Sequence, residues 1–509
     1  MRSFLAASLL VAFVLASSSA SAVALNPRGI GGVLLFPYYT VNRGQDTLVS
    51  LVNTADTAKV ARVRFLEGYN GRTVFETYVF LSAHDVWSAA ITQVADDGGA
   101  KLVSHDRTCT YPALTPEREA FVSSDYDGVA LHSGDTGPTS ITRTREGSIE
   151  VIEAADIVPG STAEVAITHA QNGTPGGGVP PCHFAGGPGS QPVPIAGLAP
   201  PTGGLYGSAS IINVADGTFV AYDATALVDF TDRVLVTDFH APGEATLADA
   251  HSSDSNRTAR AYLADDRGVL AVDFDEGIDA VTALFMQETL SNDLVTTASL
   301  GANTDWVVGF PTKRFYVDGR LQQYARAPFL EMFGEHVVEY DNSRIRGVSR
   351  VGIEAYIYDR EERMTTTRDQ EYCGYPCPVQ QPIFLSYQTN VIAFGADGTA
   401  SNTPSRVLGS VLSLYYRAGY GQPVRPDAGW MLLDITTLDP FGLNNGVNAA
   451  GETVYVFGMP AIGFMAYNIV NANAQPGVLG NYGGAFAHRG TTCRNTDGTV
   501  CFVPPPLPN

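Results

Sequence analysis

Charged residues are scarce in this chain of 509 amino acids, and basic residues are the scarcest. It has 31 Lys and Arg against 52 Asp and Glu, together 16 % of the sequence, which gives a formal net charge of −21. Nucleic acids and anionic membrane surfaces are bound through clusters of Lys and Arg. The shortage of basic residues therefore argues against both as partners. An acidic chain does permit a cation such as Ca²⁺.

The sequence also lacks the short motifs that mark many enzymes. It has no phosphate-binding loop, Gly-x-Ser-x-Gly turn, His-Glu-x-x-His helix or Cys-x-x-Cys-His haem site. We therefore expect no nucleotide cofactor, and the absence of these motifs favours a protein that is not an enzyme.

Long apolar runs are missing beyond the N-terminus. There, Arg2 precedes an apolar segment from Phe4 to Leu15, and Ala20-Ser21-Ala22 follows as a small-x-small cleavage pattern. This order is typical of a secretory signal peptide; an apolar helix of the folded core is the alternative. No later run reaches the roughly 18 residues of a spanning helix. We expect an exported protein, secreted, attached to the cell surface or periplasmic, without a transmembrane segment.

Cysteine is rare but even in number, and export would permit disulfides. The third and fourth cysteines are close in sequence, as are the fifth and sixth, so two local bridges would leave the first to pair with the second. A metal site is the alternative reading, but zinc sites usually repeat such a spacing or add spaced histidines. The six predicted disulfide residues are Cys109, Cys182, Cys373, Cys377, Cys493 and Cys501.

Glycine (52), tyrosine (23) and phenylalanine (24) are plentiful, which suits strands and turns better than helices. The clearest strand lies at 61–65, where apolar residues alternate with Arg62 and Arg64. This pattern predicts one buried face and one solvated face. Asn70-Gly71 follows and predicts a type I′ turn to a returning strand.

These patterns predict an all-β fold of two antiparallel, immunoglobulin-like β-sandwich units, with long Gly/Pro loops and at most one or two short helices. The best helix candidate begins near Asp279, which could cap it. Residues 51–56 and 211–216 are similar and suggest a repeated strand–turn–strand unit. The predicted parts are a signal peptide (1–22), an N-terminal sandwich (23–170), a Gly/Pro-rich linker or loop (171–204), a C-terminal β-rich domain (205–502) and a Pro-rich tail (503–509).

Two acidic pairs are candidate sites for Ca²⁺ or for paired catalytic carboxylates. A spacing of two would place Asp125 with Asp127, and Asp273 with Asp275, on one strand face. Facing carboxylates of this kind act in glycoside hydrolases. Solvated turns are the simpler explanation of both pairs.

Several blocks resemble a family of uncharacterised secreted or cell-surface proteins of Gram-negative bacteria. The blocks are Leu-Val-Asn-Thr-Ala-Asp (51–56), Leu-Ser-Ala-His-Asp-Val-Trp (81–87), Gly-Ile-Asp-Ala-Val-Thr-Ala-Leu (277–284), Thr-Asp-Trp-Val-Val (304–308) and Asn-Tyr-Gly-Gly (481–484). The resemblance implies an exported bacterial protein and carries no activity with it.

The sequence therefore favours a non-enzymatic protein of the cell surface or extracellular matrix, with an adhesive, structural or self-assembling role. The apolar segment from Ile30 to Val41 is an ordinary first strand or one offered to another molecule. The alternatives are a carbohydrate-binding protein, which would need a row of exposed aromatics, and a secreted hydrolase acting on glycans. The expected partners are a second copy, a surface glycan or another protein.

Overall fold

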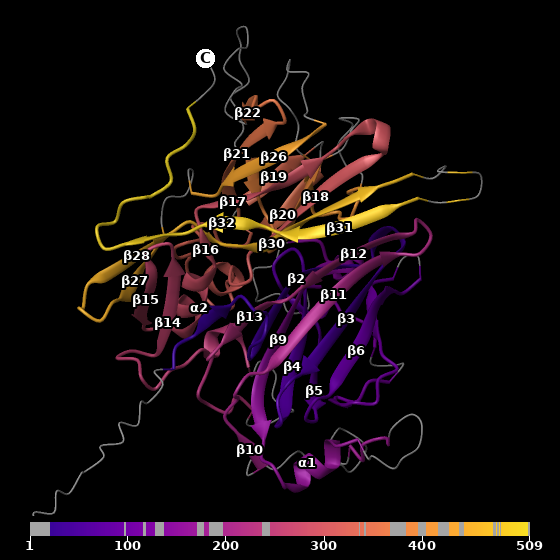
Figure 1. The fold of residues 1–509 in the computed structure, drawn as a ribbon, viewed down its shortest axis with the longest axis vertical. Coiled ribbons are helices and arrows are strands. Elements are labelled where there is room, and N and C mark those ends of the chain that lie inside the picture. The colour runs from indigo at the N-terminus through magenta and orange to yellow at the C-terminus, as the bar shows by residue number, and fades with distance from the viewer. Residues whose placement is uncertain are drawn as a thin grey trace, which may run out of the picture.

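The computed structural model describes residues 21–95, 98–115, 119–127, 137–169, 178–182, 197–236, 245–334, 336–340, 343–366, 383–394, 404–415, 427–436, 442–471, 475, 478 and 480–506. Within these ranges, 336–340, 343–346, 365–366, 383 and 414–415 are described by their backbone alone. The predicted signal peptide lies almost wholly outside the described residues. The described parts are mostly antiparallel strands, as predicted, but they contain three short helices and not one or two at most: α1 (Thr162–Ile167), α2 (Gly277–Phe285) and α3 (Arg314–Val317) (Figure 1).

Two sheets form a sandwich in the N-terminal half. The first has the order β1 (Ala24–Asn26), β13 (Thr225–Val228), β2 (Val33–Thr40), β9 (Glu146–Ile157), β4 (Ala58–Glu67), β5 (Thr73–Leu81) and β8 (Cys109–Tyr111), with β10 (Leu198–Ala199) paired to β9. The second has the order β12 (Thr218–Asp223), β11 (Leu205–Asn213), β3 (Gln45–Asn53), β6 (Val86–Gln93) and β7 (Ala100–Val103). The apolar segment after the predicted cleavage site is therefore β2, an internal strand between β13 and β9.

Alternating apolar residues of both sheets fill the space between them. Val63 and Phe65 from β4 meet Leu51 from β3 and Trp87 from β6 in one buried cluster. Each of these strands places every second residue on the inner face, as its sequence pattern predicts. Trp87 is 1 % exposed and is the largest side chain of this core.

The other face of the first sheet is buried as well, which corrects the prediction that Arg62 and Arg64 face water. Both arginines are 4 % exposed. Later parts of the chain cover them: Arg62 donates to Ala245 O at 3.3 Å, and Arg314 approaches Arg64 through the shared carboxylate of Glu150. An alternating sequence pattern shows that one face of a strand is apolar and the other polar. It does not show whether another layer of the protein covers the polar face.

The turn at Asn70-Gly71 also differs from its prediction. Only Gly71 has a positive φ, and five residues separate β4 from β5, so the connection is a longer loop and not a type I′ turn. The carboxylate of Glu67 organises the loop by accepting hydrogen bonds from the amides of Tyr69, Asn70 and Arg72 at 2.8–3.0 Å. A Cβ at Gly71 would lie 2.7 Å from the Gln388 side chain, so the loop packs too closely for a larger residue.

The strands that follow the predicted linker (171–204) belong to the N-terminal sandwich. β11 pairs with β3 along its whole length, from Leu205 opposite Asn53 to Asn213 opposite Gln45, and β13 pairs with both β1 and β2. The division of sheets therefore does not coincide with the predicted domain boundary. The similar segments at 51–56 and 211–216 lie at the ends of the paired strands β3 and β11.

The described residues of the C-terminal half form three further sheets of five or six strands and two two-stranded pairs. The first of these three has the order β14 (Ala259–Asp265), β15 (Gly268–Phe274), β27 (Leu443–Val447), β28 (Thr453–Phe457) and β33 (Cys493–Asn495). The second of them has the order β22 (Met364–Thr366), β21 (Val351–Asp359), β26 (Ala428–Asp434), β17 (Thr289–Val295) and β32 (Arg489–Thr491), with β23 (Ile383–Leu385) paired to β21. The third has the order β25 (Ser413–Tyr415), β24 (Thr389–Phe394), β18 (Ala302–Gly309), β30 (Ile462–Ile469) and β31 (Tyr482–Ala487). Two-stranded pairs are β16 (Met286–Gln287) with β29 (Met459–Pro460), and β19 (His336–Tyr340) with β20 (Ser343–Val348).

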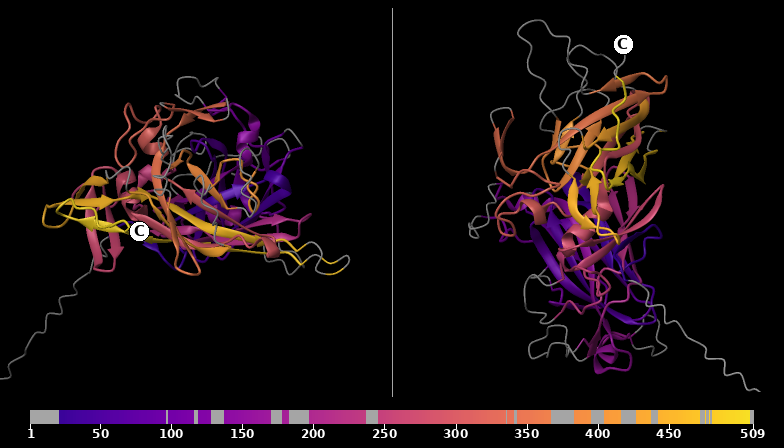
Figure 2. Two further views of the ribbon diagram at one scale, coloured as in Figure 1. Left: turned by 90° about the horizontal axis from the view of Figure 1, so that it is seen from above. Right: turned by 90° about the vertical axis from the view of Figure 1, so that its left-hand side faces the viewer.

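The two halves share their cores and lie against each other in every view (Figures 1 and 2). Val307 and Phe464, from β18 and β30, join the core of the N-terminal sandwich, where the Phe464 ring stacks on Tyr222 at 4.5 Å between centroids. The predicted helix is α2, and all of its residues are buried. Its N-cap is Glu276 and not Asp279, whose buried carboxylate instead accepts a hydrogen bond from the Tyr316 hydroxyl at 2.5 Å.

Ion pairs occupy the contact between the halves. Glu150 on β9 accepts hydrogen bonds from Arg64 on β4 and, at 3.3 Å, from Arg314 on α3, and all three side chains are buried. Burial alone would raise the pKa of Glu150, but the two guanidinium groups outweigh it and hold the pKa below its ordinary value. The carboxylate is therefore charged inside the protein and compensates two buried cations.

Replacing Glu150 with alanine is expected to destabilise the protein by about 3–5 kcal/mol, because two buried guanidinium groups lose the carboxylate that they share. The matched control is Asp275→Ala, which breaks the pair with Arg257 at 2.9 Å, where the carboxylate side chain is 70 % exposed. This second change is expected to cost about 0–1 kcal/mol. Denaturant unfolding of both variants measures the difference, and equal losses would contradict the assignment.

A second buried carboxylate fixes residues 404–412 against the sheet. Asp305 on β18 accepts hydrogen bonds from the amides of Val407 and Leu408 at 3.2 and 2.9 Å and is fully buried. Burial raises the pKa of Asp305 to about 6, although the Ser405 hydroxyl and these two amides act in the opposite direction. The folded protein therefore holds a proton on Asp305 at a pH where the unfolded chain has lost it.

This pKa predicts a pH dependence of stability. Because the folded pKa of Asp305, about 6, lies above the ordinary value of about 3.9, its stabilising contribution is complete below pH ~4 and is lost as the pH rises through ~6. Asp305→Asn removes this titration. The stability of the wild type relative to the variant should fall by about 3 kcal/mol between pH 4 and 7, measured by denaturant unfolding of both proteins. A constant difference across this range would refute the assignment.

Candidate functional site

The outer face of the second sheet of the N-terminal sandwich carries side chains that are partly or fully exposed among the described residues. Every second residue of its four longest strands points outward, opposite the core. We call the surface made by these side chains the open face. Its members are Val86, Ser88, Ala90 and Thr92 on β6, Asp46, Leu48, Ser50 and Val52 on β3, Tyr206, Ser208, Ser210 and Ile212 on β11, and Phe219, Ala221 and Asp223 on β12.

Strand pairing arranges the open face in rows. The two central rows contain mainly Ser and Ala: Ser88, Ser50 and Ser208 are direct neighbours across three strands, and Ser50 Oγ lies 3.2 Å from Ser208 Oγ. Larger apolar side chains border these rows, with Tyr206 opposite Val52 at one end and Ile212 opposite Phe219 at the other. The result is a central strip of mainly small residues between one apolar margin and a second margin in which Ile212 and Phe219 lie beside Asp46.

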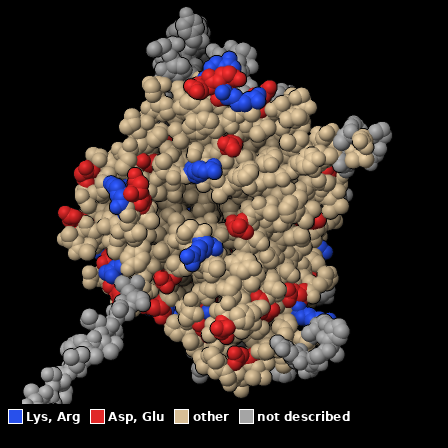
Figure 3. Space-filling model, viewed as in Figure 1, with Lys and Arg blue, Asp and Glu red and all other residues tan. Residues whose placement is uncertain are grey.

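Charge is almost absent from the open face. Two of its fifteen members are charged, Asp46 on β3 and Asp223 on β12, in a chain whose net charge is −21. Figure 3 shows the molecule from the same side as Figure 1, and uncharged residues cover most of this side. Apolar groups are exposed here: Leu48 is 41 % exposed, Val86 50 % and Phe219 52 %. Exposed apolar side chains gathered on one surface mark binding sites more often than single ones do.

β31 extends this surface beyond the edge of the sheet. It runs along β12, and a Cβ at Gly483 would lie only 2.6 Å from the Phe219 carbonyl oxygen, so glycine permits the close approach. Tyr482 and Phe486 of β31 are 65 % and 51 % exposed. Aromatic rings thus lie beside the apolar margin that contains Phe219.

The predicted acidic pair Asp125 and Asp127 lies in a turn and not on a strand. Asp125 accepts hydrogen bonds from Arg320 Nη1 at 2.5 Å and from the Thr73 amide at 3.2 Å. A cation bound by Asp125 would have to displace this arginine. The pair therefore does not form the shared strand face that its spacing predicts.

The second predicted pair is divided between buried and exposed positions. Asp273 lies on β15 and is buried, where it accepts hydrogen bonds from Arg260 Nε at 2.8 Å and Ser255 Oγ at 2.9 Å. Burial raises the pKa of Asp273, but the bonds from Arg260 and Ser255 bring it below its ordinary value. Asp275 follows the end of β15 and pairs with Arg257. Each carboxylate has its own arginine, and the two do not converge on one point.

The cysteines form the predicted disulfides where the structure describes them. Cys109 is bonded to Cys182, and Cys493 to Cys501, while the predicted pair Cys373 and Cys377 lies outside the described residues. Glu288, Cys493 and Cys501 make up the one group of three ligand-type residues found close together in the described parts. Both of its sulfurs are oxidised to the disulfide, so neither is a thiolate ligand.

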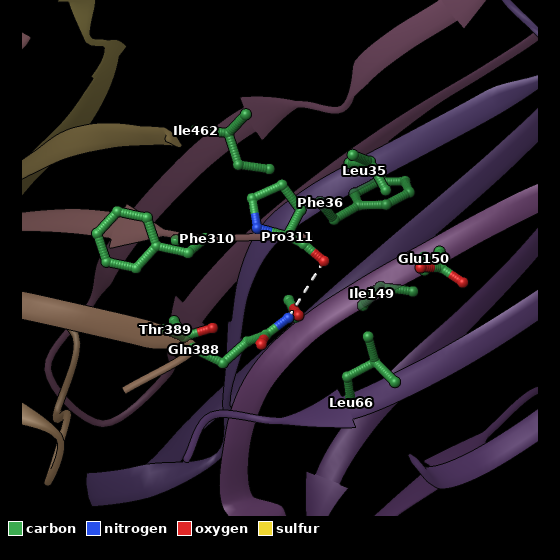
Figure 4. A pocket seen from close by; sticks show the side chains of 12 residues that line it. Leu35, Phe36, Leu66, Ile149, Glu150, Phe310, Pro311, Gln388, Thr389 and Ile462 are labelled. Carbon is green, nitrogen blue, oxygen red and sulfur yellow. Dashed lines mark hydrogen bonds between the residues drawn. The ribbon is translucent and has the colours of Figure 1, made fainter. Parts of the chain in front are cut away.

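A small cavity lies between the halves. Leu35 and Glu150 line it from the first sheet, and Phe310, Pro311 and Gln388 from the C-terminal half (Figure 4). Gln388 donates to the Pro311 carbonyl at 3.3 Å across its edge. The volume of about 20 Å³ is room for about one water molecule. This cavity is a packing gap and is too small for a substrate.

Comparisons with family models, with curated proteins and with solved structures find no match for this chain. None of the helices in the described residues is long and apolar enough to cross a membrane. The resemblance to a Gram-negative surface family therefore remains a prediction.

Sequence reasoning missed the open face, although its signal is present in the sequence. Leu48, Ser50 and Val52 alternate with core residues, and so do Tyr206, Ser208 and Ser210. What marks a binding surface is that the outward positions of neighbouring strands nearly all lack charge. Strand order has to be known before these positions can be seen as one surface.

The two disulfides are expected to differ in their contribution to stability. Cys109 and Cys182 are 73 positions apart and Cys493 and Cys501 only 8, so the first closes the longer loop of the unfolded chain. Loop-closure entropy predicts losses of about 4 and about 2.5 kcal/mol for the respective double alanine variants. Denaturant unfolding measures both, and a larger loss for the Cys493/Cys501 variant would contradict this order.

Proposed function

We propose that this is an exported, non-enzymatic protein of a Gram-negative cell surface or matrix, which assembles with further copies of itself through the open face. The observation that carries the proposal is the near absence of charge from β6, β3 and β11 on a chain with a net charge of −21. The partner is a second copy of this chain.

Electrostatics favour contact between copies at this face. Two molecules of the same strong negative charge repel each other, and the repulsion is strongest where acidic groups come together. Contact between two open faces avoids most such encounters, apart from those of Asp46, Asp223 and Asp106, whose carboxylate accepts a hydrogen bond from the Ser88 amide. The rows of Ser and Ala also suit the close face-to-face packing of sheets, about 10 Å apart.

The internal construction supports a role outside the cell. Two disulfides join parts of the chain, as is common in proteins of oxidising compartments. The shared cores and buried ion pairs make the two halves one body, which suits a structural element better than a pair of moving domains.

Glycan binding is a second candidate. Tyr206, Phe219, Tyr482 and Phe486 are each 41–65 % exposed, and aromatic rings of this kind offer apolar faces to sugar rings. A glycan-active hydrolase has less support, because each acidic pair considered from the sequence has a member engaged by arginine.

Self-assembly predicts that the mature protein sediments as dimers or larger species. Association should strengthen when NaCl is raised from 0.05 to 0.5 M, because the Debye screening length becomes about 3-fold shorter and the repulsion between the negatively charged copies weakens. Leu48→Glu places a charge at the centre of the open face and should give monomers. Val269→Glu is the control, since Val269 is 69 % exposed on β15, away from the open face.

Analytical ultracentrifugation of the three proteins, with circular dichroism to verify folding, distinguishes the outcomes. Assembly of the wild type and of Val269→Glu, but not of Leu48→Glu, supports the proposal. A wild type that stays monomeric at both salt concentrations overturns it. If the wild type is a monomer that is retained on a polysaccharide matrix, and Phe219→Ala is not retained, the result would favour glycan binding instead.

A further inference from the structure

Three ionisable residues meet inside the N-terminal sandwich, away from the open face. Lys59 on β4 and Asp156 on β9 are direct cross-strand partners, and Glu153 lies three residues before Asp156. Lys59 shares the inward-pointing face of β4 with the core residues Val63 and Phe65, since alternate residues of a strand point the same way. The lysine therefore enters the space between the two sheets, where apolar residues are the rule.

The three side chains touch one another. Lys59 Nζ lies 2.5 Å from Asp156 Oδ1 and 3.0 Å from Glu153 Oε1. The side chains of Lys59 and Glu153 are 0 % exposed and that of Asp156 is 7 % exposed. An amine and two carboxyl groups are thus held in contact where water has little access.

The residues before β11 complete the enclosure. Thr202 Oγ1 donates to Asp156 Oδ2 at 2.7 Å, and the amides of Thr202 and Gly203 donate to the Glu153 carboxyl oxygens at 3.2 and 2.8 Å. Lys59 Nζ also donates to Thr202 Oγ1 at 2.7 Å. Each reactive group is therefore fixed by neighbours from more than one element.

Burial raises the pKa of Glu153 to about 8; the nearby Asp156 adds to this increase, and Lys59 opposes it. At neutral pH Glu153 thus holds a proton that it can share with its neighbours. A carboxylic acid placed between an amine and a second carboxyl group is suited to carry protons between them.

We propose that Lys59 and Asp156 become joined by an intramolecular amide bond between Lys59 Nζ and Asp156 Cγ, with Glu153 as the proton carrier. This inference concerns the covalent structure of the chain and does not depend on the proposed function. It assigns a self-modification site in the core that needs no cofactor and no second protein.

The reaction balances with the groups present. The Lys59 ammonium gives a proton, through Glu153, to the Asp156 carboxylate, which leaves a neutral amine and a carboxylic acid. The nitrogen lone pair forms a bond to Cγ, and a C–O bond of the resulting tetrahedral centre breaks. The departing hydroxyl takes a second proton from the nitrogen, again through Glu153, and leaves as water. Glu153 ends as it began, and one ammonium and one carboxylate become an amide.

Three physical effects favour the bond. Strand pairing holds the amine against the carboxyl group, and such fixed proximity replaces an encounter in solution with an effective molarity of about 10⁵ M or more. Burial then limits the return of water to the amide once the first water molecule has left. The covalent link also replaces a buried ion pair, whose desolvation is costly.

The test is the intact mass of the folded, full-length mature protein after denaturation and complete reduction. The amide bond predicts a mass about 18 Da below that of the sequence, the loss of one water molecule. Trypsin should fail to cleave after Lys59, because the side chain is acylated, and should release a branched peptide that contains both Lys59 and Asp156.

Variants test the chemistry. Lys59→Arg and Glu153→Gln should have the full sequence mass, the latter because glutamine cannot carry the proton. Asp156→Asn keeps an acyl group and should lose ammonia instead, about 17 Da. This shift separates the proposed reaction from an unrelated dehydration elsewhere in the chain.

A wild-type protein that is folded by circular dichroism, has the full sequence mass and is cut by trypsin after Lys59 overturns the proposal. This readout requires no variant, so a variant that fails to fold does not weaken it. Persistence of the water loss in Lys59→Arg would overturn it equally, since the bond would then lie elsewhere.

Discussion

The structure depends on the burial of both faces of one sheet. The sheet that contains β2, β4 and β9 turns one face to the core of the N-terminal sandwich and the other to the C-terminal half. The second face includes Arg64 and Glu150, whose charges must be compensated within the protein. Glu150 meets this requirement for Arg64 and also binds Arg314, more than 150 positions further along the chain, and so joins the two halves. Without these ion pairs, the same contact would place isolated charges in a medium of low polarity.

Local features of this fold could be predicted from the sequence, and long-range features could not. The strands around Val63 and Trp87, the helix at 277–285 and the pairing of Cys109 with Cys182 follow from alternation, composition and cysteine spacing. The burial of Arg62 and the return of β11 to β3 depend on contacts between distant segments. A Gly/Pro-rich segment such as 171–204 has the same composition whether it separates domains or, as here, connects the two sheets of one sandwich.

The same limit applies to the functional residues. The acidic pairs were conspicuous in the sequence because like residues stood two positions apart, yet arginines from elsewhere engage Asp125, Asp273 and Asp275. No sequence motif marks the open face or the Lys59–Glu153–Asp156 cluster, because the residues of each come from neighbouring strands that are distant in the sequence. In both cases strand register, and not a local motif, creates the chemistry. It brings uncharged residues together on the outer face of the second sheet and an amine beside a carboxyl group on the inner face of the first sheet.

The pairing of early strands with late ones has a consequence for biosynthesis. β3 and β2 leave the ribosome long before β11 and β13, so during this interval each has a row of backbone amide and carbonyl groups without its final partner. Exposed strand edges invite pairing with other chains. The N-terminal sandwich therefore cannot complete its folding in step with synthesis, and a nascent chain that stops near residue 200 would be a substrate for chaperones that protect unpaired strands. The order of strands in space thus sets the earliest moment at which this protein can become a stable, closed structure.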